Sequence, residues 1–103
     1  MSEQRLSDLF DPALRRMGIR AQVREAQVQE AFADVVGAAV APLCRAVSLR
    51  RGALLVATAH SALAHQLQLE SPRIVAGVNA RIGADAVRRL AFTPLDGGDA
   101  RRR

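Results

Sequence analysis

The spacing of the apolar residues changes at Pro42, and this change limits the possible folds more than any other feature of the chain. Before Pro42, apolar side chains recur every three or four residues, which is typical of helices that bury one face. After Pro42, apolar residues alternate with polar ones or form short runs, which is typical of strands. The length of 103 residues suits one domain with one modest core. We therefore expect a single domain that contains both helices and a sheet.

An apolar stripe on one helical face predicts a first helix from position 6 to position 17. Gly18 follows at a position that commonly ends a helix. Because Pro12 lies inside the stripe, either the helix kinks there or a shorter helix begins with Pro12 and is capped by Asp11. The stripe is expected to pack on the sheet or on the second helix, and part of it is a candidate partner-binding surface. Its members are Leu6, Leu9, Phe10, Ala13, Leu14 and Met17.

A second helix is predicted to end at Ala41, because Pro42 follows. Its apolar face consists of Val28, Phe32, Val35, Val36, Ala39 and Val40.

Residues 43–60 predict a β-hairpin with its turn at Arg50-Arg51-Gly52. In the first strand, Val47 and Leu49 alternate with small or polar residues. The second strand, 53–59, is a nearly continuous apolar run and is expected to be the more buried of the two.

Two short helices and a third strand complete the predicted order. Ser61 is a candidate cap for the first helix, and Ser71 with Pro72 interrupts that helix and starts the next one, which ends at Gly83. Alternation over 87–93 predicts the last strand. The order helix, helix, strand, strand, helix, helix, strand predicts an α+β two-layer sandwich, with helices covering one face of a three-stranded sheet.

We expect residues 1–95 to form the domain, with 1–20 as its N-terminal helical segment. Residues 96–103 contain too few apolar side chains to bury and predict a flexible basic tail.

Positive charge is concentrated in the second part of the chain. The formal charge is +5 and the sequence pI is about 11.4. Residues 1–42 carry a net charge of −1, whereas residues 43–103 carry ten arginines and four acids, a net charge of +6. This asymmetry favours an anionic partner for one face of the protein. All fifteen basic residues are arginine, which we attribute first to a GC-rich coding bias and second to phosphate contacts.

The basic residues of the second part are candidates for DNA binding, although any single arginine is as readily explained as a solvated surface residue. The arginines on the hairpin and on the third strand form a continuous basic band if that strand pairs beside the hairpin. Its phosphate contacts would be independent of sequence, and because the three Phe residues lie on predicted inward faces, we expect no base stacking. The candidates are Arg45, Arg50, Arg51, Arg73, Arg88, Arg89, Arg101, Arg102 and Arg103.

A second basic group surrounds the end of the first helix and is a candidate protein-binding surface. A membrane surface is the weaker partner, because the net charge of −1 over residues 1–42 does not favour anionic lipid. This group is Arg15, Arg16, Arg20 and Arg24.

No residue pattern indicates catalysis, a metal or a cofactor. Cys44 is single and is interpreted as a small buried residue. His60 and His65 are five residues apart, so they do not share a helical face as metal ligands would. No stretch is apolar enough to cross a bilayer, and none resembles a leader. We expect a cytoplasmic, nucleoid-associated protein that is not an enzyme.

The ordered motifs resemble the DciA family of bacterial proteins that help to load or operate the replicative helicase. The resemblance covers residues 6–93 and rests on the order of the motifs. They read Phe32, Val35-Val36-Gly37, Ala41-Pro42, the hairpin 43–60, Ser61 to Leu67, Val78-Asn79, Gly83 and the last strand 87–93. Phe32 and Leu63 stand where the family usually has Trp.

The resemblance implies a fold similar to a type II KH domain and a replicative helicase as the partner. A KH domain that binds nucleic acid carries Gly-x-x-Gly between its paired helices. This chain has Glu70-Ser71-Pro72-Arg73 there, which argues against the usual KH grip on single strands.

The leading hypothesis is therefore a DNA replication accessory protein that binds the replicative helicase and DNA and aids helicase loading. The alternatives are a general nucleic-acid-binding module without a helicase partner and a domain that binds proteins only.

Overall fold

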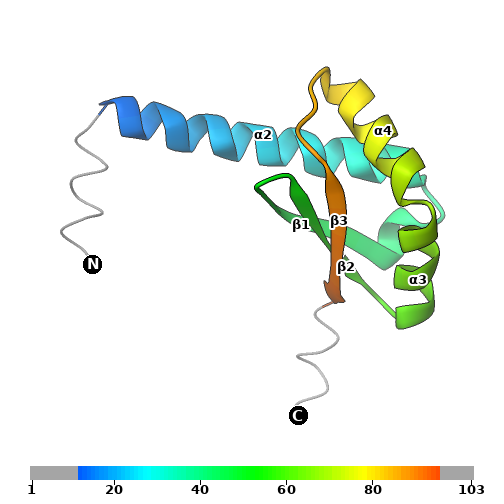
Figure 1. The fold of residues 1–103 in the computed structure, drawn as a ribbon. Coiled ribbons are helices and arrows are strands. Elements are labelled where there is room, and N and C mark those ends of the chain that lie inside the picture. Colours follow the sequence, from blue (N-terminus) through cyan, green and yellow to red (C-terminus); the bar gives the residue numbers. More distant parts are fainter. Residues whose placement is uncertain (1–11, 96–103) are drawn as a thin grey trace, which may run out of the picture.

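The computed structural model of the chain describes residues 12–95 (Figure 1). The predictions for residues 1–11 and for the basic tail at 96–103 lie outside the described residues. The elements follow in the order α2 (Pro12–Val36), a 3-10 helix η1 (Ala41–Leu43), β1 (Cys44–Arg50), β2 (Ala53–Thr58), α3 (Ser61–Leu69), α4 (Ser71–Ile82) and β3 (Arg89–Pro94). The predicted α+β class with a three-stranded sheet is confirmed.

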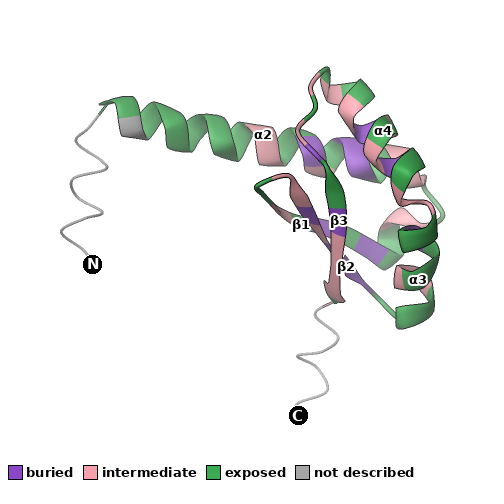
Figure 2. Cartoon of the chain, viewed as in Figure 1, coloured by how far each residue is buried: buried purple, intermediate pink, exposed green. Residues whose placement is uncertain are grey.

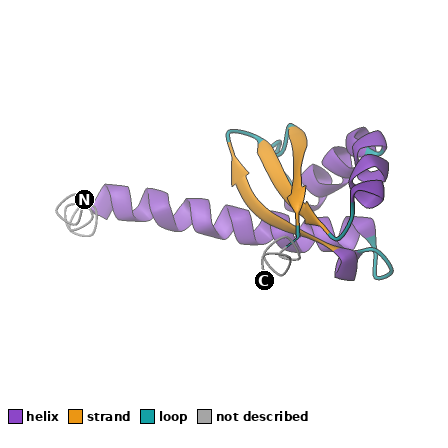
Figure 3. Cartoon of the chain, turned by 90° about the horizontal axis from the view of Figure 1, so that it is seen from below, coloured by secondary structure: helices purple, strands orange, loops and turns teal. Residues whose placement is uncertain are grey.

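The sheet is mixed, with strand order β1-β2-β3 (Figure 3). Strands β1 and β2 form the predicted antiparallel hairpin, and β3 pairs with the other edge of β2 in parallel. The parallel pairing requires a crossover, which α3 and α4 supply. Strand β2 is therefore the central strand, and four of its six residues are buried, as expected.

The core lies between the long helices and one face of the sheet. Helix α2 contributes Val28 and Phe32, and α4 contributes Ile74 and Val78. The central strand adds Leu54 and Val56 from one face, with Leu90 from β3. Phe32 is 1% exposed. Of the apolar face predicted for the second helix, Val28 and Phe32 thus lie in the core, and Val35, Val36 and Val40 pack against it. Ala39 of the same face is exposed.

Helix α2 is continuous through Gly18, so the prediction that a helix ends there was wrong. The φ angle of Gly18 is not positive, and the chain continues helically to Val36. The prediction that the helix reaches Ala41 was also wrong. Gly37 has a φ of 93° and its amide donates to the Ala33 carbonyl, which ends the helix before Pro42. Residues 41–43 form the separate helix η1 instead.

The break between α3 and α4 occurs where it was predicted, but the caps differ. His60, rather than Ser61, caps α3, because its Nδ1 accepts a hydrogen bond from the Leu63 amide at 3.2 Å. Glu70 precedes the first residue of α4. Gly83 ends α4 in the left-handed region, as predicted.

Strand β1 contains an irregularity in its pairing with β2 that the alternating sequence did not predict. The register with β2 shifts between Ala46 and Ser48, as in a β-bulge. Ala46 is buried, whereas Val47, which the alternation placed inward, is 37% exposed. Beyond the shift, Leu49 returns to the core side of the sheet.

The first half of α2 extends beyond the sheet as an isolated helix (Figures 1 and 2). Met17 is 62% exposed, so the expectation that the stripe packs on the sheet or on another helix fails at this residue.

Candidate nucleic-acid interface

The hairpin turn and the start of β3 meet at one end of the sheet. The carbonyl oxygen of Gly52 accepts hydrogen bonds from the amides of Arg88 at 2.7 Å and Arg89 at 3.1 Å. The register pairs Ala53 with Arg89, so the start of β3 lies directly beside the turn. Four exposed arginines, here called the arginine cluster, are gathered at this end: Arg50, Arg51, Arg88 and Arg89.

The turn itself requires an unusual backbone. Arg51 has a φ of 52° and Gly52 a φ of 82°, and positive φ at both central residues is the requirement of a type I′ hairpin turn. A left-handed conformation costs a residue other than glycine about 1–2 kcal/mol. Arg51 therefore occupies a position at which Asn or Gly is favoured.

The strand register also defines the sheet face that the core does not use. Arg50, Ala53 and Arg89 form one cross-strand row on this face. The next rows are Ser48, Leu55 and Ala91, and then Arg45, Ala57 and Thr93. None of these nine positions is acidic. The face therefore combines small or apolar residues at its centre with arginines at three corners, and Arg45 joins the face although it lies two rows from the cluster.

Arg73 belongs to a different part of the molecule. It forms an ion pair with Glu70 at the junction of α3 and α4, which lies away from the hairpin turn in Figures 1 and 3. Gln66 donates to the other oxygen of the same carboxylate at 2.6 Å. The hydrogen bond from Arg73, followed by that from Gln66, holds the pKa of Glu70 below its ordinary value. The structure therefore does not bring Arg73 together with the sheet arginines.

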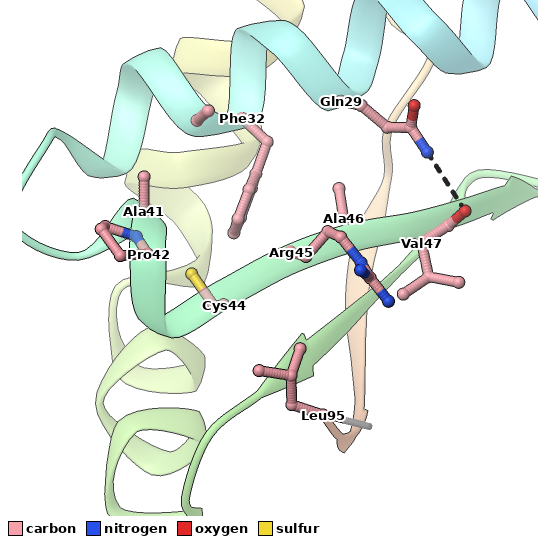
Figure 4. Close-up of a pocket in the computed structure, with 10 residues that line it drawn as sticks. Gln29, Phe32, Ala41, Pro42, Cys44, Arg45, Ala46, Val47 and Leu95 are labelled. Carbon is pink, nitrogen blue, oxygen red and sulfur yellow. Dashed lines mark hydrogen bonds between the residues drawn. The ribbon is translucent and has the colours of Figure 1, made fainter. Parts of the chain in front are cut away.

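A shallow pocket of about 720 Å³ lies between α2 and β1 (Figure 4). Gln29 crosses it and donates to the Val47 carbonyl at 3.2 Å. The thiol of Cys44 is buried beside the pocket, and this burial raises its pKa. A raised pKa keeps the sulfur protonated, so Cys44 is a poor nucleophile. Among the described residues no group of three or more His, Cys, Asp or Glu side chains is arranged to hold a metal.

The second basic group, at positions 15, 16, 20 and 24, lies on α2. Arg15, Arg16 and Arg20 are exposed, and Arg24 is half-buried. Along α2 these residues precede Glu25, whose Oε2 accepts from the Leu49 amide at 2.9 Å. They therefore lie on the part of α2 that leads up to the sheet, and Arg24 lies where α2 meets β1. The tail arginines, 101–103, lie outside the described residues.

Asn79 entered the sequence analysis only as part of the Val78-Asn79 motif, and its role as the residue that anchors β3 was not predicted. Asn79 on α4 donates from Nδ2 to the Val87 carbonyl at 2.8 Å and accepts at Oδ1 from the Val87 amide at 2.9 Å. These bonds hold Val87 just before β3, so the strand begins at Arg89 and not at the predicted Val87. Two signals in the sequence point to Asn79: its place in the Val78-Asn79 motif, and its position inside a helix, where Asn is intrinsically unfavourable.

No helix of the described part is long and apolar enough to cross a membrane.

The model of the family described as "Dna[CI] antecedent, DciA" matches residues 5–92. The chain belongs to the DciA family. No curated protein matches it. The resemblance found in the sequence is thereby confirmed, and DciA membership is consistent with a replication-related role in helicase loading.

The structure gives a physical meaning to two of the DciA-like motifs. Asn79, of the Val78-Asn79 pair, anchors the entry to β3, and Gly83 ends the helix that carries it. Phe32, at a position where DciA proteins usually have Trp, is a core residue, so this substitution concerns packing.

Proposed function

We propose that this DciA-family chain is a non-enzymatic accessory protein of DNA replication that binds the replicative helicase and contacts DNA through the arginine cluster. The observation that carries the DNA contact is the pair of hydrogen bonds from Arg88 and Arg89 to Gly52, which places four exposed arginines at one end of the sheet. Membership of the DciA family supports the replicative helicase as the partner. We place this activity in the cytoplasm, at the nucleoid.

The chemistry of the cluster favours phosphate as its ligand. Guanidinium groups bind phosphate oxygens in pairs of hydrogen bonds, and four of them close together suit a repeating polyanion. The strained φ of Arg51 supports a functional reason for an arginine in the turn, because Asn or Gly fits that backbone better. Contacts of this type fix the position of DNA without reading its sequence.

The order of the elements supports a KH-like arrangement of type II, with residues 1–95 as one domain. We propose a DNA-binding mode different from that of other KH-like domains. The turn at which such domains approach the phosphates carries the ion pair of Glu70 and Arg73 here. Because Glu70 neutralises Arg73, this turn offers phosphate no net positive charge, so the exposed sheet face and its arginines are the more favourable surface.

In this mechanism the protein acts by differential binding. It favours the helicase conformation that admits a strand of DNA, and the free energy comes from binding that conformation more tightly than the other. The arginine cluster keeps the strand near the helicase while this conformation is populated.

The test of the DNA contact is the salt dependence of DNA binding. Each phosphate contact that is lost reduces the slope of log affinity against log salt by about 0.7–0.9. We expect the double variant Arg50→Gln, Arg89→Gln to reduce the slope by about 1.5 and to weaken binding for every DNA sequence alike. The matched control is Arg73→Gln with Arg81→Gln, which removes the same charge away from the sheet. Equal slopes for both double variants would refute the cluster as the contact.

The test of the partner is retention of the cognate replicative helicase by the purified full chain at near-physiological salt. Retention of DNA without helicase would instead indicate a general nucleic-acid-binding module, and retention of helicase without DNA would indicate a domain that binds proteins only.

A further inference from the structure

The isolated half of α2, residues 12–24, presents large apolar side chains to solvent. Met17 is 62% exposed, Ile19 53% and Val23 51%. The segment is about 20 Å long at the helical rise of 1.5 Å per residue. Helices of soluble proteins bury such side chains against another element, and within the described part of the chain no element covers these three. Figure 2 shows the exposed run along the helix up to the point where α2 reaches the sheet.

The charges of the segment have one sign. Residues 12–24 contain four arginines and no acid, whereas the chain before Pro42 carries a net charge of −1 as a whole. The acids that balance this charge therefore lie outside the segment. A local charge of +4 on one short helix attracts an acidic surface and repels a second copy of itself.

The apolar side chains lie on more than one side of the helix. Met17 is eleven residues before Val28, which is three turns, so it continues the face that α2 buries in the core. Ile19 and Val23 are one turn apart and lie on another side. A membrane surface covers only one side of a helix, so this distribution favours a groove that encloses the helix.

We propose that residues 12–24 form a docking helix that inserts into an apolar groove with an acidic rim on a partner protein. This inference rests on the proposed function, in which the partner is the replicative helicase, and it assigns the contact to one segment of the chain. The apolar side chains supply contact area, and the arginines supply orientation and faster association with the rim. The arginine cluster on the sheet remains available for DNA.

Three large apolar side chains distinguish this surface from a DNA-binding helix. The grooves of DNA offer phosphates and base edges, which suit arginine, but they offer little that would bury Ile19 and Val23. An acidic protein groove satisfies both the charge and the apolar area.

The first experiment measures the affinity of the full chain for the cognate helicase after removal of apolar area. We expect Met17→Ser and Val23→Ser each to weaken binding about ten-fold, which corresponds to burial of about half of such a side chain. The control is Gln22→Ser, which changes an exposed polar residue of the same segment and is expected to leave affinity within about two-fold. Because the segment lies outside the core, all three variants keep their circular dichroism spectrum and unfolding midpoint.

The second experiment uses Gly18, which weakens the helix at the middle of the segment. A glycine inside a helix costs about 1 kcal/mol relative to alanine. A Cβ at Gly18 would meet no atom within 4 Å, so alanine fits the free protein. If the segment binds as a helix, Gly18→Ala orders it in advance and tightens helicase binding by up to about five-fold. Gly18→Pro disrupts the helix and weakens binding.

The outcomes separate this inference from the proposed function. Loss of helicase binding in the Ser variants, with DNA binding unchanged, supports the docking helix. Wild-type affinity in Met17→Ser, Val23→Ser and Gly18→Pro would overturn the docking helix and leave the helicase partner in place. If the Ser variants lose DNA binding but keep helicase binding, the segment binds nucleic acid, and the docking helix is overturned as well. A wild-type chain that does not bind helicase overturns the proposed function and this inference together.

Discussion

The Arg88 backbone is hydrogen-bonded to Gly52, and the Arg88 side chain lies against the place that a Cβ on residue 52 would occupy. The Arg88 amide donates to the Gly52 carbonyl at 2.7 Å, and the Cβ and Cγ atoms of Arg88 lie 3.2 and 3.0 Å from the place that a Cβ on residue 52 would occupy. The hairpin turn is thereby joined to the segment before β3, although the two are 36 residues apart in the sequence. The position of the arginine cluster depends on this contact.

The first prediction concerns Gly52→Ala. Both the positive φ and the contact with Arg88 oppose a Cβ at this position. Gly37→Ala is the matched control, because Gly37 also has a positive φ but an open space where the Cβ would lie. We expect the control to lower the free energy of unfolding by about 1–2 kcal/mol and Gly52→Ala to lower it further. Urea denaturation of both variants measures the difference, and equal losses would show that the Arg88 contact contributes nothing.

Replacement of Arg51 is expected to change stability and DNA affinity in opposite directions. Asn tolerates the left-handed conformation of this turn better than arginine does, so Arg51→Asn should raise the free energy of unfolding by about 0.5–1 kcal/mol. The same change removes one cation from the cluster and should weaken DNA binding. Denaturation and a DNA titration on one sample test both effects. A variant that is less stable than the wild type would contradict the assignment of strain to this residue.

Asn79 should be among the most sensitive polar positions. Its replacement by Ala leaves both polar groups of the Val87 backbone without their partner, and Val87 is 2% exposed. We expect Asn79→Ala to lower the free energy of unfolding by about 1–3 kcal/mol. Ala76→Ser, at an exposed position of the same helix, serves as the control and should stay within about 0.5 kcal/mol of the wild type. An Asn79 variant as stable as this control would argue against the anchoring role.

The pKa of Glu70 should lie below its ordinary value and should rise in Arg73→Gln, because the hydrogen bond from Arg73 is the largest cause of the shift. A carboxyl whose pKa is lower in the folded state stabilises the fold above the unfolded pKa, and this stabilisation is lost as the pH falls through the folded pKa. A carbon-13 NMR titration of the Glu70 carboxyl in both proteins measures the shift. An identical titration curve in the variant would exclude Arg73 as its cause.

The element order was largely readable from the sequence because strong local signals carried it. Pro72 marked the start of α4, Gly83 marked its end, and the apolar run of β2 marked the central strand. The end of α2 was predicted too late because it was assigned from Pro42. The helix ends five residues earlier, at Gly37, which has a left-handed φ. At Gly18 the prediction of a helix end was wrong because a glycine also tolerates ordinary helical angles, and α2 continues through it.

The candidate site was predictable in part. The proximity of Arg50 and Arg51 follows from the sequence alone, but their proximity to Arg88 and Arg89 depends on the parallel pairing of β3 with β2. That pairing includes contacts between distant parts of the sequence, such as the hydrogen bonds from the Arg88 and Arg89 amides to the Gly52 carbonyl, and no local pattern encodes it. Arg73 was predicted to bind DNA only because it is basic. In the structure it forms an ion pair with Glu70, away from the arginine cluster.

The central claim is that one small protein binds the replicative helicase and DNA through separate surfaces. The most direct test is retention of the cognate helicase by the purified chain at near-physiological salt, with and without DNA, for the wild type and the variant Arg50→Gln, Arg89→Gln. We predict that both proteins retain the helicase without DNA, and that only the wild type also retains DNA strongly. A wild-type chain that retains no helicase under either condition would contradict the account.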